Sequence, residues 1–193
     1  MNDVVLLSGG IDSTLCLWLA SLRGPVMALC VDYGQHAAAT EARISKMLAG
    51  RVGVSFRLLR VQEIAQFSHS ALTQFGNASD PASTVVPGRN AMLLGFGAGV
   101  AQTIGAKRVW IGCNGDDAEV YADCRPQFIG LMSAALEGAY GCTVEAPLLG
   151  LSKKEVVKRA QSLVVPLAAT SSCYLGTACG ECHACKMRAA ALA

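Results

Sequence analysis

The residues with the clearest chemical meaning lie near the N-terminus, at positions 8–13 (Ser-Gly-Gly-Ile-Asp-Ser). They follow a short apolar stretch and precede a helical pattern, so backbone N–H groups and a helix dipole can meet an anion there. The loop lacks the lysine with which a Walker-type loop reaches the outer phosphates during γ-phosphoryl transfer. Its neutral donors suit pyrophosphate leaving the α-phosphorus, with Asp12 as a ligand for Mg²⁺. The loop is therefore predicted to hold pyrophosphate as it departs; the simpler alternative is a turn in which Asp12 or Ser13 only caps the helix.

Four of the nine cysteines crowd together near the C-terminus, at Cys173, Cys179, Cys182 and Cys185. Their C-x5-C-x2-C-x2-C spacing lets the sulfur atoms grip one ion from tight turns, and four thiolates close a tetrahedral zinc site with no open position for catalysis. We predict a structural zinc ion that fastens the C-terminus to the domain. An iron–sulfur cluster also suits four thiolates, a redox pair is a further alternative, and His183 offers a substitute ligand.

The composition is typical of one ordinary globular domain. The 193 residues are 52% apolar, which is enough for a sizeable core, and a net charge of +2 lacks the electrostatic footprint of a dedicated nucleic-acid binder. The longest apolar run, residues 91–101, is shorter than the roughly 20 residues that cross a bilayer. Asp3 stands where a signal peptide carries positive charge. We expect a cytoplasmic protein with neither a membrane nor a nucleic-acid partner.

Apolar periodicity predicts alternating strands and helices. Strands are expected at residues 4–7, 26–31, 54–61 and 108–113, and helices at residues 13–22, 40–51, 88–104, 125–139 and 152–163. This alternation is typical of an α/β fold, with a parallel sheet and helices on both faces. The glycine loop then lies at the carboxyl end of the first strand, where such sheets bind ligands. Residues 68–87 lack periodicity, which suits either a mobile lid or plain disorder.

The chain resembles a known superfamily at this loop. SGGxDS after an N-terminal strand is the PP-loop of the ATP pyrophosphatases, which form acyl-adenylates or similar intermediates and share the adenine-nucleotide α-hydrolase-like fold. Over nearly its whole length the chain is similar to the 7-cyano-7-deazaguanine synthase family. The stretches that carry this similarity are SGGIDST, residues 32–35 (Asp-Tyr-Gly-Gln), residues 86–90 (Val-Pro-Gly-Arg-Asn), residues 121–126 (Tyr-Ala-Asp-Cys-Arg-Pro) and the cysteine-rich tail from Ser172 to Arg188. We expect residues 1–167 to form the ATP-binding domain, and residues 168–193 a zinc-binding segment packed on it.

The resemblance implies a ligase reaction in two stages. ATP adenylates the carboxylate of 7-carboxy-7-deazaguanine, and ammonia displaces AMP to give an amide. A second ATP activates the amide oxygen, and loss of AMP leaves the nitrile, a precursor of queuosine. The implied cofactors are ATP, Mg²⁺ and Zn²⁺, and the family expectation is a homodimer.

The resemblance also suggests which residues bind the nucleotide. They belong to the PP-loop and to the end of the second strand: Leu7, Ser8, Gly9, Gly10, Ile11, Asp12, Ser13, Thr14, Tyr33, Gln35 and His36. Of these, Asp12 and Ser13 are also expected to take part in catalysis.

The substrate is expected to contact Arg89, Asn90, Tyr121, Asp123 and Arg125. Asp123 is apt to accept two hydrogen bonds from the guanine-like N1–H and 2-amino edge. Arg89 or Arg125 is apt to neutralise the substrate carboxylate or the α-phosphate with a planar guanidinium. These three residues are therefore also candidate catalytic residues, and Asn90 is expected to orient the amide. The alternatives are an exposed ion pair for Asp123 and Arg125, and helix capping for Arg89 and Asn90.

Three departures from the family pattern widen the functional alternatives. His36 follows Gln35 directly where the family has an intervening arginine, Val120 and Ala122 flank Tyr121 where Gly-Tyr-Pro is usual, and the first cysteine spacer is short. These leave room for a relative that stops at the amide, or that joins the deazaguanine carboxylate to another amine, for example on a protein acceptor. A tRNA-thiolating PP-loop enzyme and a non-enzymatic zinc-bearing module are the remaining alternatives.

Overall fold

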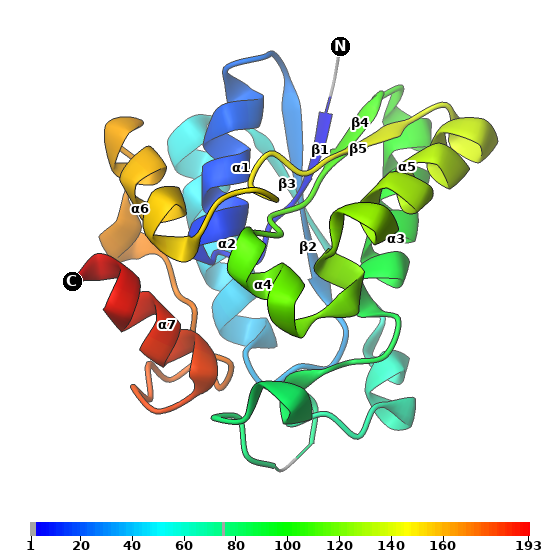
Figure 1. Cartoon of the computed structure of the whole chain (residues 1–193). Coiled ribbons are helices and arrows are strands. Elements are labelled where there is room, and N and C mark those ends of the chain that lie inside the picture. The colour runs from blue at the N-terminus through cyan, green and yellow to red at the C-terminus, as the bar shows by residue number, and fades with distance from the viewer. Residues whose placement is uncertain (1–2, 75) are drawn as a thin grey trace.

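The computed structural model describes residues 3–74 and 76–193, and these form one parallel sheet (Figure 1). The strands are β1 (Asp3–Leu6), β2 (Val26–Asp32), β3 (Ser55–Arg60), β4 (Arg108–Trp110) and β5 (Thr143–Glu145). Neighbouring strands are parallel throughout, in the order β3-β2-β1-β4-β5, so the expected parallel sheet is confirmed. The sequence does not predict β5, because three half-buried residues are too few to show a period.

Helices cover both faces of the sheet, as expected. The α-helices of the described residues are α1 (Ile11–Ser21), α2 (Ala38–Val52), α3 (Arg89–Ile104), α4 (Gly115–Val120), α5 (Pro126–Tyr140), α6 (Lys153–Ser162) and α7 (His183–Leu192), and short 3₁₀ helices span Gln62–Phe67, Pro81–Thr84, Ala122–Cys124 and Leu167–Ala169. One hydrophobic core lies between the sheet and α1, α2 and α6, and another between the sheet and α3 and α5 (Figure 1). None of the helices in the described residues is long and apolar enough to cross a membrane.

Two of these helices, α4 and α7, are absent from the sequence prediction. α4 is only six residues long, and none of its residues is buried. α7 mixes small apolar and basic residues around its whole circumference and also has no buried residue. A helix without a distinct apolar face gives no periodic signal.

A buried carboxylate joins the two central strands. Asp3 is 1% exposed, and it accepts hydrogen bonds from Arg108 Nε (2.9 and 3.0 Å) and from Trp110 Nε1 (2.9 Å). A buried carboxylate without such partners would be strongly destabilising, so these bonds favour one pairing of β1 with β4. That pairing brings the loops after β1 and β4 to the same edge of the sheet.

The sheet changes its direction of winding between β1 and β4, which is where doubly wound sheets open a crevice for ligands. Residues 8–10 follow β1, and residues 111–114 follow β4. Gly112 allows the two loops to approach closely, because a Cβ at this position would lie only 2.8 Å from the Ser13 backbone nitrogen. The fold therefore places the PP-loop at the crevice that the sequence predicts.

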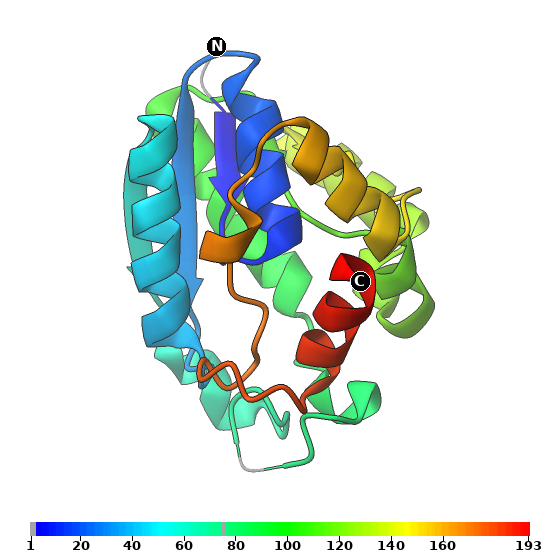
Figure 2. The same cartoon turned by 90° about the vertical axis from the view of Figure 1, so that its left-hand side faces the viewer.

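The C-terminal segment runs from this crevice along the lower edge of the domain to α7 (Figure 2). The Ser171 N–H donates to the Gly9 carbonyl (2.9 Å), and the His183 N–H donates to the Ala78 carbonyl (3.0 Å). The segment therefore contacts both the PP-loop and the long loop of residues 68–87. Beyond the cysteines, α7 packs against α6.

The long loop has turn structure of its own, residue 75 lying outside the described residues. The Ala71 N–H donates to the Ser83 carbonyl (2.7 Å), just within the 3₁₀ helix Pro81–Thr84. Ala71 also packs in a small apolar cluster with Cys173. The loop therefore rests on the cysteine segment, and its role as a lid stays a prediction.

Candidate active site

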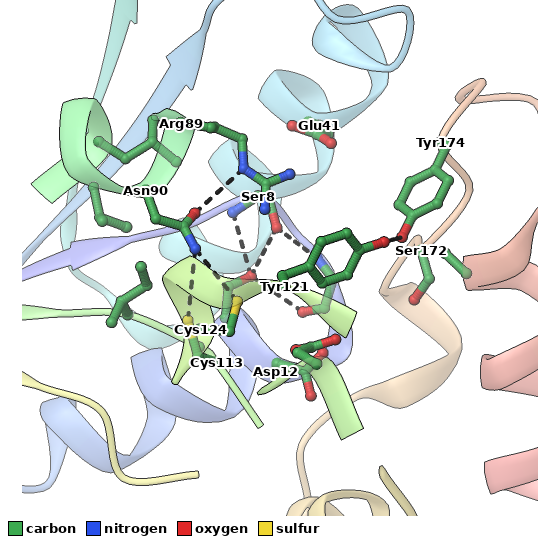
Figure 3. A pocket seen from close by; sticks show the side chains of 18 of the residues that line it. Ser8, Asp12, Glu41, Arg89, Asn90, Cys113, Tyr121, Cys124, Ser172 and Tyr174 are labelled. Atoms are coloured by element: carbon green, nitrogen blue, oxygen red, sulfur yellow. Dashed lines mark hydrogen bonds between the residues drawn. The ribbon is translucent and has the colours of Figure 1, made fainter. Parts of the chain in front are cut away.

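A pocket of about 280 Å³ opens at the carboxyl ends of β1, β2 and β4 (Figure 3). This volume is close to the lower end of small-molecule pockets, which begin at roughly 300 Å³. The polar and charged residues that line it are Ser8, Asp12, Ser13, Tyr33, Gln35, Glu41, Arg89, Asn90, Asn114, Asp116, Asp117, Tyr121, Lys153, Ser171, Ser172, Tyr174 and His183. They come from segments far apart in the sequence, and the fold alone brings them together.

The glycine loop is shaped for an anion. Gly9 has a φ of +79°, in the left-handed region, and a Cβ there would lie 2.7 Å from Ile44 Cγ2, so both conformation and space require glycine. Gly10 is the N-cap of α1 and has no side chain to cap it. Thr14 Oγ1 donates to the Gly10 carbonyl (2.6 Å) and stabilises the turn. The first N–H groups of α1 are consequently left for a ligand at the pocket.

Two serine hydroxyls stand beside these N–H groups. Ser13 Oγ lies 3.1 Å from Ser8 Oγ and accepts a hydrogen bond from the Ser8 N–H (3.2 Å). Ser8 is exposed toward the pocket, whereas Ser13 is buried. The pair adds neutral donors next to the helix N-terminus, as the sequence predicts.

A cation reaches the PP-loop from the start of α6. Lys153 Nζ forms an ion pair with the Asp12 carboxylate, and the two side chains are only 13% and 16% exposed. A capping box of Ser152 and Glu155 begins α6 at this point, and the Lys153 N–H donates to Asp116 Oδ2 (2.9 Å). A distant segment therefore brings a lysine ammonium to a loop that has no lysine of its own. In the sequence, only the capping box points to this position.

Polar groups from the loop after β4 and from α4 lie beside Asp12. Asn114 Nδ2 donates to Asp12 Oδ1 (3.3 Å), and Asn114 Oδ1 accepts from the Asp117 N–H (3.0 Å) at the start of α4. Burial, and then the nearby charge of Asp12, raises the pKa of Asp117 to about 6, although Lys153 lowers it. The carboxylates of Asp12 and Asp117 are hard oxygen donors of the kind that Mg²⁺ takes in proteins, so this pair fits that ion, whereas Asn114 turns its Nδ2 toward Asp12.

A second group of charges lines the pocket away from Asp12 (Figure 3). Gln35 is 5% exposed; its Nε2 donates to the Val31 carbonyl (3.2 Å) and to Glu41 Oε2 (2.9 Å), and its Oε1 accepts from the Tyr33 N–H (2.9 Å). Burial raises the pKa of Glu41, and the Gln35 hydrogen bond and the Arg89 charge reduce this rise. Gln35 therefore fixes the orientation of the Glu41 carboxylate, a residue that no sequence motif marks.

Arg89 and Asn90 begin α3 on the same side of the pocket. Arg89 Nε donates to Asn90 Oδ1 (3.2 Å), and Asn90 Nδ2 donates to the Asp123 carbonyl (3.1 Å) and lies 3.4 Å from Cys124 Sγ. Asn90 is 4% exposed, so its amide is fixed by the protein. The hydrogen bond with Cys124 and burial raise the pKa of Cys113 well above its ordinary value, so this thiol stays protonated.

Three hydroxyl groups meet where the long loop, the segment before α5 and the cysteine segment converge. Tyr121 Oη lies 2.7 Å from Thr84 Oγ1 and 3.4 Å from Tyr174 Oη. Figure 3 shows the two tyrosine rings approaching each other at their hydroxyl ends. Burial, together with the neighbouring Tyr121, raises the pKa of Tyr174, so its hydroxyl is neutral. The pair forms one wall of the pocket.

The cysteine cluster lies directly behind this wall. The sulfur atoms of Cys173, Cys179, Cys182 and Cys185 all lie within 4.8 Å of one another, so these residues could hold one metal ion. Backbone N–H groups also point at the sulfurs, from Cys179 to Cys173 Sγ and from Cys182 to Cys179 Sγ (3.4 Å each). Four sulfurs at this separation match the tetrahedral geometry of zinc, which has Zn–S distances of about 2.3 Å.

A family model described as "Queuosine biosynthesis protein QueC" matches residues 2–193. This chain belongs to the QueC family. The 7-cyano-7-deazaguanine synthase of Oceanobacillus iheyensis is 36% identical over 200 residues, which cover 96% of this chain and 90% of that protein. The enzyme of the same name from Myxococcus xanthus is 39% identical over 210 residues, with the same coverage.

Two solved structures share the fold. The NMN synthetase from Francisella tularensis superposes with a TM-score of 0.55 at 21% identity, covering 86% of this chain and 63% of that one. The NH3-dependent NAD synthetase from Campylobacter jejuni superposes with a TM-score of 0.53 at 20% identity, covering 85% of this chain and 64% of that one. This chain therefore spans less than two thirds of either structure, and at these identities the likeness concerns the fold alone. It agrees with the adenine-nucleotide α-hydrolase-like class.

The structure brings most of the predicted site residues of this QueC-family chain together. Those that line the pocket are Leu7, Ser8, Gly10, Asp12, Ser13, Tyr33, Gln35, Arg89, Asn90 and Tyr121. Gly9, Ile11 and Thr14 instead shape the loop from behind, Ile11 as part of the core. His36 is exposed, with Nε2 3.1 Å from the Gln74 carbonyl.

Two predicted substrate residues lie outside the pocket lining. Asp123 Oδ2 accepts a hydrogen bond from the Asn90 N–H (3.3 Å) at the start of α3. Arg125 is exposed, and its Nε donates to the Ala118 carbonyl (3.3 Å). Asp123 therefore supports Asn90 from behind, and Arg125 braces α4.

Proposed function

We propose that this protein is an ATP-dependent carbon–nitrogen ligase that converts 7-carboxy-7-deazaguanine into 7-cyano-7-deazaguanine. Membership of the QueC family supports the choice of substrate and product. The observation that carries the proposal is that one pocket is lined both by the PP-loop, with Asp12 and Lys153, and by Glu41 and Arg89, which lie away from Asp12 (Figure 3). One end suits phosphates, and the other suits a polar ring system.

In the first stage the substrate carboxylate attacks the α-phosphorus of ATP, and pyrophosphate departs. The hydroxyls of Ser8 and Ser13, the first N–H groups of α1 and the Lys153 ammonium receive the charge that builds on the leaving group. Mg²⁺, when bound, neutralises phosphate charge, and Asp12 with Asp117 would hold it. Ammonia then attacks the acyl carbon, and AMP departs with one substrate oxygen and leaves the amide.

In the second stage the amide oxygen attacks the α-phosphorus of a second ATP. Loss of AMP, which carries away the last substrate oxygen, and of protons from nitrogen leaves the nitrile. The same residues serve both stages, because the leaving group is pyrophosphate each time. Lys153 takes the place of a P-loop lysine in charge, but it starts from an ion pair with Asp12, not from the loop itself.

The cysteine cluster is proposed to bind zinc in a structural role. Four thiolates saturate a tetrahedral ion and leave no position for substrate. Ser172, Tyr174 and His183 lie next to the ligand cysteines in the chain and line the pocket, so the bound ion would hold that wall in place. On the family resemblance we also propose a homodimer that works in the cytoplasm.

Incubation with ATP, Mg²⁺, 7-carboxy-7-deazaguanine and ammonia, followed by mass spectrometry, tests the proposal. We expect AMP, pyrophosphate and the nitrile, with two molecules of AMP for each nitrile. An amide that accumulates without nitrile would identify a reaction that stops half-way, and an adduct with another amine would identify a different nucleophile. AMP formation that is the same with and without the deazaguanine would refute the assignment.

A further inference from the structure

Glu41 presents a carboxylate to the pocket from the first turn of α2. Gln35 is buried and donates to Glu41 Oε2 (2.9 Å), and its other contacts, to the Val31 carbonyl and from the Tyr33 N–H, fix the Gln35 amide. A buried amide with every polar atom engaged holds its partner in one orientation. Glu41 is thus a positioned carboxylate on a rigid element, not a solvated surface charge.

Arg89 is the opposite charge on the same side of the pocket, and Figure 3 shows both side chains turned toward the cavity. The ion pairs within the described residues join Arg23 to Glu145, Arg108 to Asp3, and Lys153 to Asp12, and include neither Glu41 nor Arg89. Two opposite charges that line one cavity without pairing directly leave room for a ligand that has an acceptor for one and donors for the other.

An apolar wall borders these two charges. Tyr33 and Leu72 belong to one hydrophobic cluster, and Leu93 and Tyr174 pack against it. All four also line the pocket. Large apolar faces beside a few placed polar groups are typical of sites for a flat heterocycle, whose ring edge meets the polar groups.

We propose that Glu41 and Arg89 together read the guanine-like edge of the deazapurine. Glu41 accepts hydrogen bonds from the N1–H and the 2-amino group, and Arg89 donates to the neighbouring ring carbonyl. This edge runs acceptor, donor, donor, which is the complement of a guanidinium next to a carboxylate. The inference rests on the proposed function and names the residues that select its substrate.

Asp123 is the rival for this role, because a carboxylate there has the same chemistry. Its Oδ2 already accepts the Asn90 N–H (3.3 Å), and it is not among the residues that line the pocket. Adenine offers a second rival reading, since its exocyclic amine and ring nitrogen also present a donor beside an acceptor. The experiment therefore measures deazapurine and ATP separately.

The first arm changes the ligand and leaves the protein intact. Calorimetry compares 7-carboxy-7-deazaguanine with the analogue that lacks only the 2-amino group. Wild-type protein is expected to bind the analogue about 10- to 100-fold more weakly, because one hydrogen bond of a two-point contact is lost. Equal affinity for both ligands would overturn the inference. Failure of the wild type to bind 7-carboxy-7-deazaguanine at all would refute the proposed function, and the inference with it.

The second arm changes the protein. In Glu41→Gln an amide N–H₂ replaces one acceptor and faces a ligand donor, so the preference for the 2-amino group should fall to about 2-fold or less, with ATP affinity unchanged. Glu137→Gln, an exposed position on α5, is the matched control and should behave as the wild type. The rival Asp123→Asn should keep the preference. The inference fails if Glu41→Gln keeps the preference for the 2-amino group, or if only Asp123→Asn loses it. It also fails if Glu41→Gln lowers the affinity for ATP as much as the affinity for the deazapurine.

Discussion

The two ends of the pocket are built in different ways. The phosphate end is built around one continuous stretch, residues 8–13, to which Asn114, Asp117 and Lys153 are added, whereas the other end takes Glu41, Arg89, Tyr121 and Tyr174 from four separate segments. The first end must stabilise departing pyrophosphate and need not match one ring system, so a local motif supplies its centre and distant residues such as Lys153 add charge. The second end must match one ring system, and only the folded chain assembles it.

The largest expected effect is at the phosphate end. Asp12→Ala should reduce AMP formation by about 10³-fold or more, because the loop loses a carboxylate beside the phosphates and Lys153 loses its ion-pair partner. Circular dichroism should stay normal, since Asp12 lies at the pocket and not in the core. Near-normal AMP release from a folded Asp12→Ala protein would break the assignment of this end.

Two adjacent lysines sharpen the same comparison. Lys153 forms the ion pair with Asp12, whereas Lys154 is exposed on the same helix turn. Lys153→Ala should reduce kcat by about 10- to 100-fold, because one cation no longer stabilises the leaving pyrophosphate. Lys154→Ala should leave kcat within about 2-fold. Equal effects of the two substitutions would mean that Lys153 contributes only general surface charge.

A substitution in the cysteine cluster tests the deazapurine end of the pocket. Cys179→Ser should lower the metal content and the melting temperature together, by about 2–4 °C for each kcal/mol lost. Tyr174 and His183 lie beside the cluster and line the pocket, so the deazapurine KM should rise more than the ATP KM, with kcat of the folded fraction near normal.

Cys142→Ser is the control for this prediction, because Cys142 is buried outside the cluster. The Cys142→Ser protein should keep its full metal content, even if the substitution lowers its melting temperature. A Cys179→Ser protein that is folded and metal-replete but chemically dead would contradict the structural role. Iron with acid-labile sulfide in the wild type would contradict zinc.

The smallest expected effect concerns Asp117. Burial and the Asp12 charge raise its pKa from 3.8 to about 6, so the unfolded chain loses this proton at a lower pH than the folded one. Ionising Asp117 in the folded protein therefore lowers the free energy of unfolding. This loss is absent below about pH 4 and complete above about pH 6, and stability falls as the pH rises between them.

Asp117→Asn should remove that loss of stability. The variant should therefore gain about 1–3 kcal/mol of unfolding free energy over the wild type at pH 7, and little at pH 4, in urea titrations without nucleotide. Glu119→Gln, an exposed change on the same helix, should follow the wild-type profile. A constant difference across the pH range would show that Asp117 is not the titrating group.

The sequence predicts those parts of the site that are continuous motifs, and not those that the fold assembles from separate segments. Residues 8–13 and the four cysteines are short motifs with fixed spacing, and both lie together as the sequence predicts. Glu41 and Lys153 belong to no such motif. Each is one charged residue in an amphipathic helix, and only the packing of that helix places the charge at the pocket. Asp123 shows the reverse, because its motif suggests a contact with substrate, which stays a prediction, while in the structure its carboxylate accepts the Asn90 N–H and does not line the pocket.

The fold is predicted more completely than the site. Apolar periodicity predicts the strands and helices with a clear period to within a few residues, such as β2 (Val26–Asp32) and α3 (Arg89–Ile104). β5 and α4 are too short to show a period, and α7 has no apolar face. Their positions depend on tertiary contacts, such as the packing of α7 on α6.

The central claim is that both carboxylate oxygens of 7-carboxy-7-deazaguanine leave on AMP, one in each stage. The most direct measurement uses 7-carboxy-7-deazaguanine labelled with ¹⁸O at both carboxylate oxygens, with mass spectrometry of all products. The account predicts one ¹⁸O in each of two AMP molecules, none in pyrophosphate and none in the nitrile. Label in inorganic phosphate together with ADP, or AMP without label, would contradict attack at the α-phosphorus.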